Sequence, residues 1–164
     1  MTTIYEAAGG AEGLLALAQE WHRLAYSDPV ISHAFTAGTP QDPDGVRIAA
    51  YWAEALGGPD HYSRVMGGET AAVRAHAGNG SHLDFDARGE ELFERAVDEC
   101  GYTGELAATL KAYFRWANLA MTSYPAAVDD VPDGLSVPHW DWDGPVSGTS
   151  NVREAREPRH GDVR

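Results

Sequence analysis

Cysteine is almost absent from this sequence: Cys100 is the only one among 164 residues. A single thiol excludes an internal disulfide, and no cysteine pair exists to hold zinc or an iron–sulfur cluster. Long apolar runs are also missing, because no stretch of about 18 apolar residues occurs, so no transmembrane helix is expected. Residues 1–5 lack the basic stretch and apolar core of a signal peptide. These absences together predict a cytoplasmic protein.

Basic residues are scarce. Lysine and arginine total 12 against 25 aspartates and glutamates, which gives a formal net charge of −13 at pH 7. Such an acidic surface repels nucleic-acid phosphates and anionic membranes, so neither is expected as a partner. Hydrophobic residues make up 43% of the chain, and its length suits one domain with a sizeable core.

Local signatures of several enzyme classes are absent as well. The glycine pairs lack the Lys-Ser/Thr of a phosphate-binding loop, and no serine lies in a nucleophile-elbow pattern. No His-Glu-x-x-His zinc motif and no EF-hand loop is present. The chain does contain seven histidines, five tryptophans, seven tyrosines and four phenylalanines. Candidate chemistry therefore has to be sought among imidazoles and aromatic rings.

Apolar residues recur at helical spacing through most of the chain, with no strand-like alternation and no internal repeat. Breakers separate the periodic segments: Asp28-Pro29 ends the first, Gly57-Gly58-Pro59 the second and Pro125 the last. A loop rich in glycine and proline covers residues 38–45. The pattern predicts an all-α fold of five to six helices. Helices are predicted from Gly10 to Asp28 and over about 46–56, 69–77, 87–100 and 104–124, with a short segment through Ile31 and Phe35.

The C-terminal tail has a mixed composition. Residues 126–148 are rich in proline, glycine and aspartate, but they also contain Trp140 and Trp142, which are unusual in a disordered segment. These tryptophans predict that the tail is partly ordered and packs onto the globule. Residues 149–164 mix charges and are expected to be disordered. The predicted organisation is one helical domain over residues 1–125, a packed tail and a disordered end.

His76 has the most informative setting of the histidines. It lies near the end of a short predicted helix, before Gly78-Asn79-Gly80, and the alanines around it would let a flat macrocycle approach. A neutral imidazole is a good iron ligand when a nearby carbonyl holds its other nitrogen. The alternative is an exposed histidine favoured by the helix dipole, and the local residues alone favour that alternative. His22, beside Trp21 on an apolar stripe, is either a boundary residue or a donor directed into a pocket.

Several short motifs follow one another along the chain. They are Tyr5-Glu6-Ala7-Ala8-Gly9-Gly10; Ser27-Asp28-Pro29-Val30-Ile31 with Phe35; residues 51–59 with Tyr62; Val73-Arg74-Ala75-His76; residues 97–101; and residues 135–144. Their order resembles that of the truncated hemoglobins, most closely their second group, and the last motif is similar to the tail of an actinobacterial subset. The resemblance covers residues 4–144 and reverses the interpretation of His76, because a surface histidine does not explain the whole order.

The resemblance implies a two-over-two helical sandwich that binds heme b, with His76 as the axial ligand of the iron. Phe35 would pack on the heme face, His22 would take the place of the family's distal tyrosine, and Arg47 would pair with a heme propionate. The heme contacts that it implies are Phe35, Arg47, Ile48, Trp52, Phe85 and Phe93, and the distal ligand-binding residues are Trp21, His22, Asp44 and Ile48.

Two departures from the family bear on function. The pocket tryptophan of the family falls near Gly89 here, where no tryptophan is present. The residues His82-Leu83-Asp84-Phe85 are similar to the segment that begins at the iron-ligating histidine in the family. This similarity makes His82 a second candidate ligand. An imidazole at position 22 also titrates near neutral pH, so the predicted distal donor differs from a tyrosine hydroxyl.

Four functions are compatible with these residues. The favoured one is a globin that reversibly binds oxygen, nitric oxide or carbon monoxide at a histidine-ligated iron. The second is a heme enzyme, peroxidase-like or oxygen-activating, in which His22 transfers protons and space near Gly89 admits an organic substrate. A heme-free helical interaction domain and a non-heme metal site are the other two. The oligomeric state is open, with a homodimer as one option.

Overall fold

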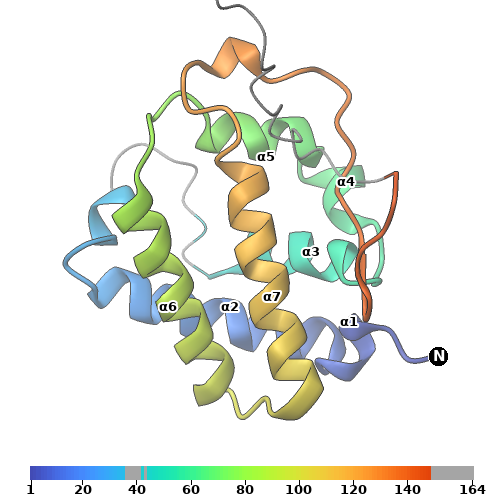
Figure 1. Cartoon of the computed structure of the whole chain (residues 1–164). Helices are drawn as coiled ribbons and strands as arrows, with labels where there is room; N and C mark the ends of the chain where they lie inside the picture. The colour runs from blue at the N-terminus through green and yellow to red at the C-terminus, as the bar shows by residue number, and fades with distance from the viewer. Residues whose placement is uncertain (36–41, 43, 149–164) are drawn as a thin grey trace, which may run out of the picture.

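A computed structural model of the chain describes residues 1–35, 42 and 44–148, and this part of the protein is almost entirely helical (Figure 1). Its α-helices are α1 (Ile4–Ala7), α2 (Gly10–Ser27), α3 (Val46–Ala55), α4 (His61–Val65), α5 (Gly68–His76), α6 (Leu83–Glu99) and α7 (Gly104–Met121). Two 3-10 turns and one antiparallel hairpin complete it: η1 (Ser32–Phe35), η2 (Val128–Asp130), and β1 (Trp140–Asp141) with β2 (Gly144–Pro145). The all-α prediction is confirmed. The segment predicted to be disordered, 149–164, and most of the loop predicted over 38–45 lie outside the described residues.

Four helices form two packed pairs. α2 packs against α3, α6 packs against α7, and α2 also contacts α6, so the two pairs share one core. The shorter α5 lies against α7, far from α1 (Figure 1). This is the two-over-two arrangement that the resemblance to the truncated hemoglobins implies. Among the described residues, no helix combines the length and the apolarity needed to cross a bilayer.

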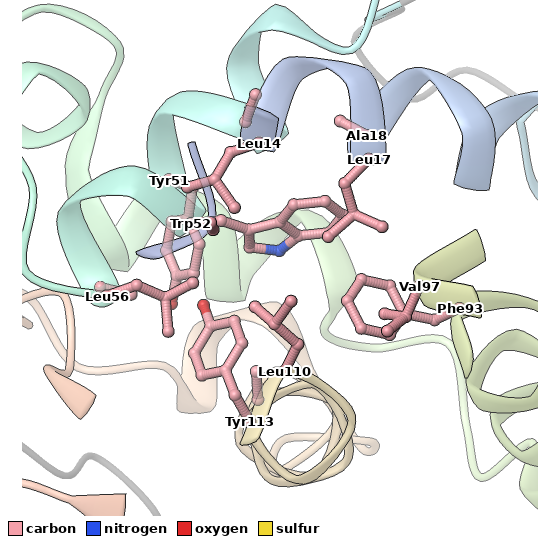
Figure 2. Close-up of a cluster of buried hydrophobic side chains, with 14 of the residues drawn as sticks. Leu14, Leu17, Ala18, Tyr51, Trp52, Leu56, Phe93, Val97, Leu110 and Tyr113 are labelled. Atoms are coloured by element: carbon pink, nitrogen blue, oxygen red, sulfur yellow. The ribbon is translucent and has the colours of Figure 1, made fainter. Parts of the chain in front are cut away.

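All four of these helices contribute to the apolar core (Figure 2). At its centre the Phe93 ring stacks parallel to Phe114 with ring centroids 4.0 Å apart, and Trp52 meets Phe93 edge-on at 5.3 Å. Edge-on contacts of this kind suit the quadrupoles of the rings. The side chains labelled in Figure 2 come from the apolar stripes that predict the helices: Leu14, Leu17, Ala18, Tyr51, Trp52, Leu56, Phe93, Val97, Leu110 and Tyr113.

Tyr5 and Gly58, which belong to two of the sequence motifs, meet where α1 packs on the end of α3. A Cβ on Gly58 would lie 2.7 Å from both the Tyr5 ring and the Ala53 carbonyl oxygen, so a larger residue would force one of them to move. The Tyr5 N–H donates to the Leu56 carbonyl at 3.0 Å. The two motifs are therefore halves of one contact, although they are far apart in the chain.

Several boundaries differ from the predicted ones. α6 begins at Leu83, one turn earlier than predicted, because Asp84 and Asp86 are well placed at the positive end of the helix dipole. α7 ends at Met121 rather than at Tyr124. Just after this end, the hydroxyls of Thr122 and Ser123 donate back to carbonyls of the helix. The sequence does not predict α1, α4 or the hairpin, because segments of two to five residues are too short to show a period.

The C-terminal tail runs back along the molecule beside α5 and α7. Next to α5, the Leu135 N–H donates to the Thr70 hydroxyl at 3.0 Å. Further along, Trp140 is buried in the main core, and the Trp142 indole donates to the Thr2 carbonyl at 2.8 Å. The two tryptophans thus join the hairpin to the core and to the N-terminus.

Candidate functional site

His76 is the last residue of α5, and its exposed side chain is held by its own helix. The ring Nδ1 lies 2.8 Å from the Ala72 carbonyl oxygen, one turn earlier. Because a carbonyl can only accept, Nδ1 carries the proton and Nε2 keeps its lone pair for a metal. The chain then turns away, and the Gly78 N–H donates to the Tyr124 carbonyl at 3.0 Å, which ties the end of α5 to the end of α7.

His82, the second candidate ligand, has a different partner. Its Nε2 is hydrogen bonded to the Asn79 carbonyl within the same turn, so Nε2 carries the proton and the lone pair is on Nδ1. Both histidines lie near Asp86: burial raises the pKa of this carboxyl, and the charges of His82 and His76 act in the opposite direction. The end of α5 and the first turn of α6 are therefore neighbours, and both imidazoles are exposed there.

A cavity of about 520 Å³ opens beside this turn. It is lined by Val30 and His33 on one side and by residues 81–85 on the other. Phe85 is half-buried, and its ring meets His33 edge-on at 5.7 Å. Phe35, another predicted heme contact, ends the η1 turn that carries His33. The structure thus brings Phe85 and η1 to the walls of one cavity, while His76 is not among its lining residues.

Asp28 holds one wall of this cavity in place. Its Oδ1 accepts the N–H groups of Val30 at 2.8 Å and Ile31 at 3.3 Å, and its Oδ2 accepts Nε of Arg88 at 2.8 Å. Burial raises the pKa of the Asp28 carboxyl, but the bonds from Arg88 and the two backbone groups outweigh it and lower the pKa overall. The carboxylate therefore links α6 to the segment that leads into η1.

Replacing Asp28 with asparagine is expected to lower the free energy of unfolding at pH 7. Because folding lowers the pKa of Asp28, its contribution is present above the ordinary value of 3.8 and is lost as the pH falls through the folded value. Urea unfolding at a series of pH values should therefore show the difference between wild type and variant shrinking below pH 3.8. The control is Asp133→Asn, since Asp133 pairs with Arg74 on the surface. A difference that stays constant with pH would contradict this role.

His22 belongs to α2, and its side chain is only 6% exposed. Its ring is 5.3 Å from Trp21 and 5.9 Å from Tyr26. Burial lowers the pKa of His22, and the charge of Asp42 acts weakly in the opposite direction. The imidazole is therefore neutral at neutral pH and carries a single N–H donor.

Trp21 spans the space between α2 and α6. Its indole N–H donates to the Gly89 carbonyl at 3.2 Å. Its ring meets Trp52 edge-on at 6.2 Å and Phe114 at 5.5 Å. A Cβ added to Gly89 would find no atom within 4 Å, so the space into which a side chain at this position would project is open. The Trp21 indole of α2 is therefore hydrogen bonded to the backbone of α6 at Gly89, but it does not fill the space of a side chain at this position.

Asp42, an acidic residue whose charge acts on His22, was missed by sequence reasoning. Asp42 accepts the N–H of Ile48 at 3.0 Å with its Oδ2, which caps the start of α3, and its charge acts on His22. The predicted Asp44 is exposed, and its carbonyl accepts Nε2 of Gln19 at 3.3 Å. A capping rule would have favoured Asp44, which lies next to the N-cap Gly45, so no local signal singles out Asp42.

Three further predicted contacts have partners within the protein. The Arg47 guanidinium donates to the Met66 carbonyl and lies over the Tyr62 ring, with its central carbon 5.9 Å from the ring centroid. Trp52 and Phe93 are fully inside the aromatic core. Arg47 thus stabilises the junction of α4 and α5, and its pairing with a heme propionate stays a prediction. The heme contacts of Trp52 and Phe93 also stay predictions.

These residues suit a heme. His76 offers a lone pair on Nε2 and has alanines as its neighbours in the sequence, and Phe85 lines the cavity beside the first turn of α6. Nowhere in the described part of the chain do three His, Cys, Asp or Glu side chains gather as a metal site of their own. A sandwich of two helix pairs, with an imidazole at the end of a short helix beside them, is the arrangement that the resemblance to the truncated hemoglobins implies.

Comparison with known proteins gives the family. The sequence model of the bacterial-like globins matches residues 3–122, and the chain belongs to this family. It is a truncated hemoglobin, and its cofactor is heme. No curated protein matches it in sequence.

Solved structures with the same fold include hemoglobins from three bacteria. That of Chloroflexus aurantiacus is 25% identical, with a TM-score of 0.64 over 74% of this chain and 98% of that one. That of Thermobifida fusca is 26% identical, with a TM-score of 0.62 over 76% and 99%. The group II 2-on-2 hemoglobin of Agrobacterium tumefaciens, at 23% identity, a TM-score of 0.62 and coverage of 76% and 96%, shows the fold alone. The two-over-two prediction is confirmed.

Proposed function

We propose that this truncated hemoglobin reversibly binds oxygen or another diatomic gas at a heme iron held by His76. The observation that carries the proposal is the contact of His76 Nδ1 with the Ala72 carbonyl at 2.8 Å. It orients the ring and raises the basicity of Nε2, which is how proteins prepare an imidazole for iron. A ferrous heme with one histidine ligand supplies an open position at which oxygen, nitric oxide and carbon monoxide bind.

His22 is the donor proposed for the bound gas. It is buried, it carries one N–H when neutral, and the ring of Trp21 packs beside it. Asp42 caps α3 and adds a negative charge near the imidazole. A hydrogen bond from His22 would stabilise the partial negative charge on oxygen, whereas carbon monoxide gains less from it.

Replacing His22 with phenylalanine is expected to release oxygen about tenfold faster, because the loss of one hydrogen bond of about 1.4 kcal/mol corresponds to a factor of ten. Stopped-flow or flash-photolysis kinetics of the oxygen and carbon monoxide complexes measure the effect, and carbon monoxide release should change less. His61→Phe is the control, since His61 is exposed on α4. Equal acceleration for both gases would indicate a steric rather than a hydrogen-bonding role.

A heme enzyme acting on an organic substrate is the second candidate. The observation that favours it is the open space beside Gly89, together with the buried imidazole of His22, which suits proton transfer. Peroxide-dependent oxidation of a phenolic dye tests it. Turnover that collapses in both His22→Phe and Gly89→Phe would favour the enzyme. Turnover that is absent, or that is the same in all three proteins, would leave gas binding as the function.

A further inference from the structure

A buried phenol–carboxylate pair joins α3 to α5. The Tyr51 hydroxyl donates to Oε2 of Glu69 at 2.8 Å, and the two residues are 7% and 1% exposed. A carboxylate shut away from water is costly unless hydrogen bonds and favourable fields stabilise it. Glu69 has both, because the phenol donates to it and it lies in the first turn of α5, at the positive end of the helix dipole. Heme ligation and gas binding as proposed above use neither residue.

Other phenols surround this pair. The Tyr62 ring meets Tyr51 edge-on at 5.1 Å, and the hydroxyls of Tyr51 and Tyr113 lie beside each other in Figure 2. Burial raises the pKa of Tyr51 well above its ordinary value, and the neighbouring Tyr113 and Glu69 raise it further. The phenol therefore does not ionise by itself. If it loses an electron, its proton has to leave at the same time, and the bonded carboxylate oxygen is where that proton can go.

Oxidisable rings lead away from the pair in two directions. Toward the distal side, Trp52 follows the phenol in the chain and meets Trp21 edge-on at 6.2 Å. Toward the surface, Tyr113 meets Trp140 at 5.8 Å, and Trp140 lies 5.7 Å from the half-buried Trp116. Aromatic rings therefore lead from the neighbourhood of His22 toward Trp140 of the hairpin, and the phenol–carboxylate pair lies between the two branches.

We propose that Tyr51 is a one-electron oxidation site of this protein, with Glu69 as its proton acceptor. In the oxidation the O–H bond of Tyr51 breaks, the proton passes to Oε2 of Glu69, and the electron passes through the neighbouring rings to the oxidant. A one-electron reductant reverses the step, returning the electron to the ring while the proton moves back from Glu69. Tyr51 thus collects oxidising equivalents that enter from peroxide at the heme side or from an oxidant at the protein surface.

Electron paramagnetic resonance of freeze-quenched, heme-loaded protein tests this assignment with two oxidants. One is hydrogen peroxide, and the other is photogenerated ruthenium(III) tris-bipyridine, which needs no heme. The variants are Tyr51→Phe and Glu69→Gln, the second of which keeps an acceptor oxygen but removes the base. The matched control is Tyr102→Phe, because the Tyr102 hydroxyl donates at 2.8 Å to the Ala8 carbonyl, which is not a base that can take up its proton. Circular dichroism checks that each variant is folded.

We expect a tyrosyl radical in the wild type and in Tyr102→Phe, loss of that signal in Tyr51→Phe, and loss or much slower formation in Glu69→Gln. A tyrosyl signal at the wild-type level in folded Tyr51→Phe or Glu69→Gln, or no tyrosyl radical with either oxidant, would overturn the assignment. Heme binding is read separately from the Soret band. A missing Soret band would count against the proposed function, while the ruthenium experiment would still decide the role of Tyr51.

Discussion

Replacing His76 with alanine is expected to abolish the optical spectrum of a histidine-ligated heme in protein reconstituted with hemin. The variant removes the imidazole whose Nδ1 is held by the Ala72 carbonyl at 2.8 Å and whose Nε2 is available for iron. The apolar surroundings remain, so some heme is expected to bind without its normal axial ligand. Spectra of the ferric, ferrous and carbon monoxide-bound forms, recorded for wild type and variant, measure the change.

Two controls make this result specific. His82→Ala should keep the wild-type spectrum, because the His82 side chain is held by Asn79 in the loop before α6 and not by α5. Added imidazole should restore a nitrogen-ligated spectrum to His76→Ala by entering the space that the side chain leaves. If His76→Ala binds heme with an unchanged spectrum, the ligand is elsewhere, and His82 is the next residue to test. If the wild type binds no heme, the proposed function is wrong.

Replacing Phe93 with alanine is expected to lower the free energy of unfolding by about 3–5 kcal/mol, the cost of removing a large buried aromatic side chain. The ring is 1% exposed, stacks parallel to Phe114 at 4.0 Å and meets Trp52 edge-on at 5.3 Å. The surrounding helices can close only part of the space that it leaves, because four of them meet at this core. Urea unfolding at a fixed heme concentration measures the change, since bound heme itself stabilises the fold.

Leu119→Ala is the matched control for this experiment. Leu119 is also a large apolar residue in a helix, but it is 64% exposed on α7. Its replacement should change the free energy of unfolding by no more than about 0.5 kcal/mol. A loss of less than about 1 kcal/mol for Phe93→Ala would show that the core repacks more completely than its geometry indicates. The dependence of unfolding on urea should be the same in all three proteins, because none of the changes alters the overall surface exposed.

The helices and their order could be predicted from the sequence because both depend on local patterns. Apolar residues at helical spacing and breakers such as Gly57-Gly58-Pro59 place α3, and similar signals place α2, α5, α6 and α7 to within a turn. The position of His76 at the end of a short helix also follows from local signals. The interpretation of His76 as an iron ligand does not follow from local signals. It depends on the order of the motifs along the chain, because the local residues alone favour a surface histidine.

The surroundings of the other candidate site residues could not be predicted from local patterns. Asp42 rather than Asp44 lies near His22, because the start of α3 is capped by the earlier aspartate. The side chain of Arg47 is directed to the Met66 carbonyl, a partner that no spacing rule connects with it. A shift of one or two residues at a helix start changes which side chain faces a pocket, and sequence patterns do not resolve shifts of that size.

By itself the sequence determined the all-α class and the helical segments, while His76 as the iron ligand stays a prediction. Only the tertiary structure decided that Trp21 donates to the carbonyl of Gly89, that Tyr51 and Glu69 share a buried hydrogen bond, and that Trp140 enters the core from the tail. The physical reason is the range of the interactions. Helix periodicity depends on neighbours within a few residues, whereas each of these contacts joins different elements, and it exists only after the helices have packed together.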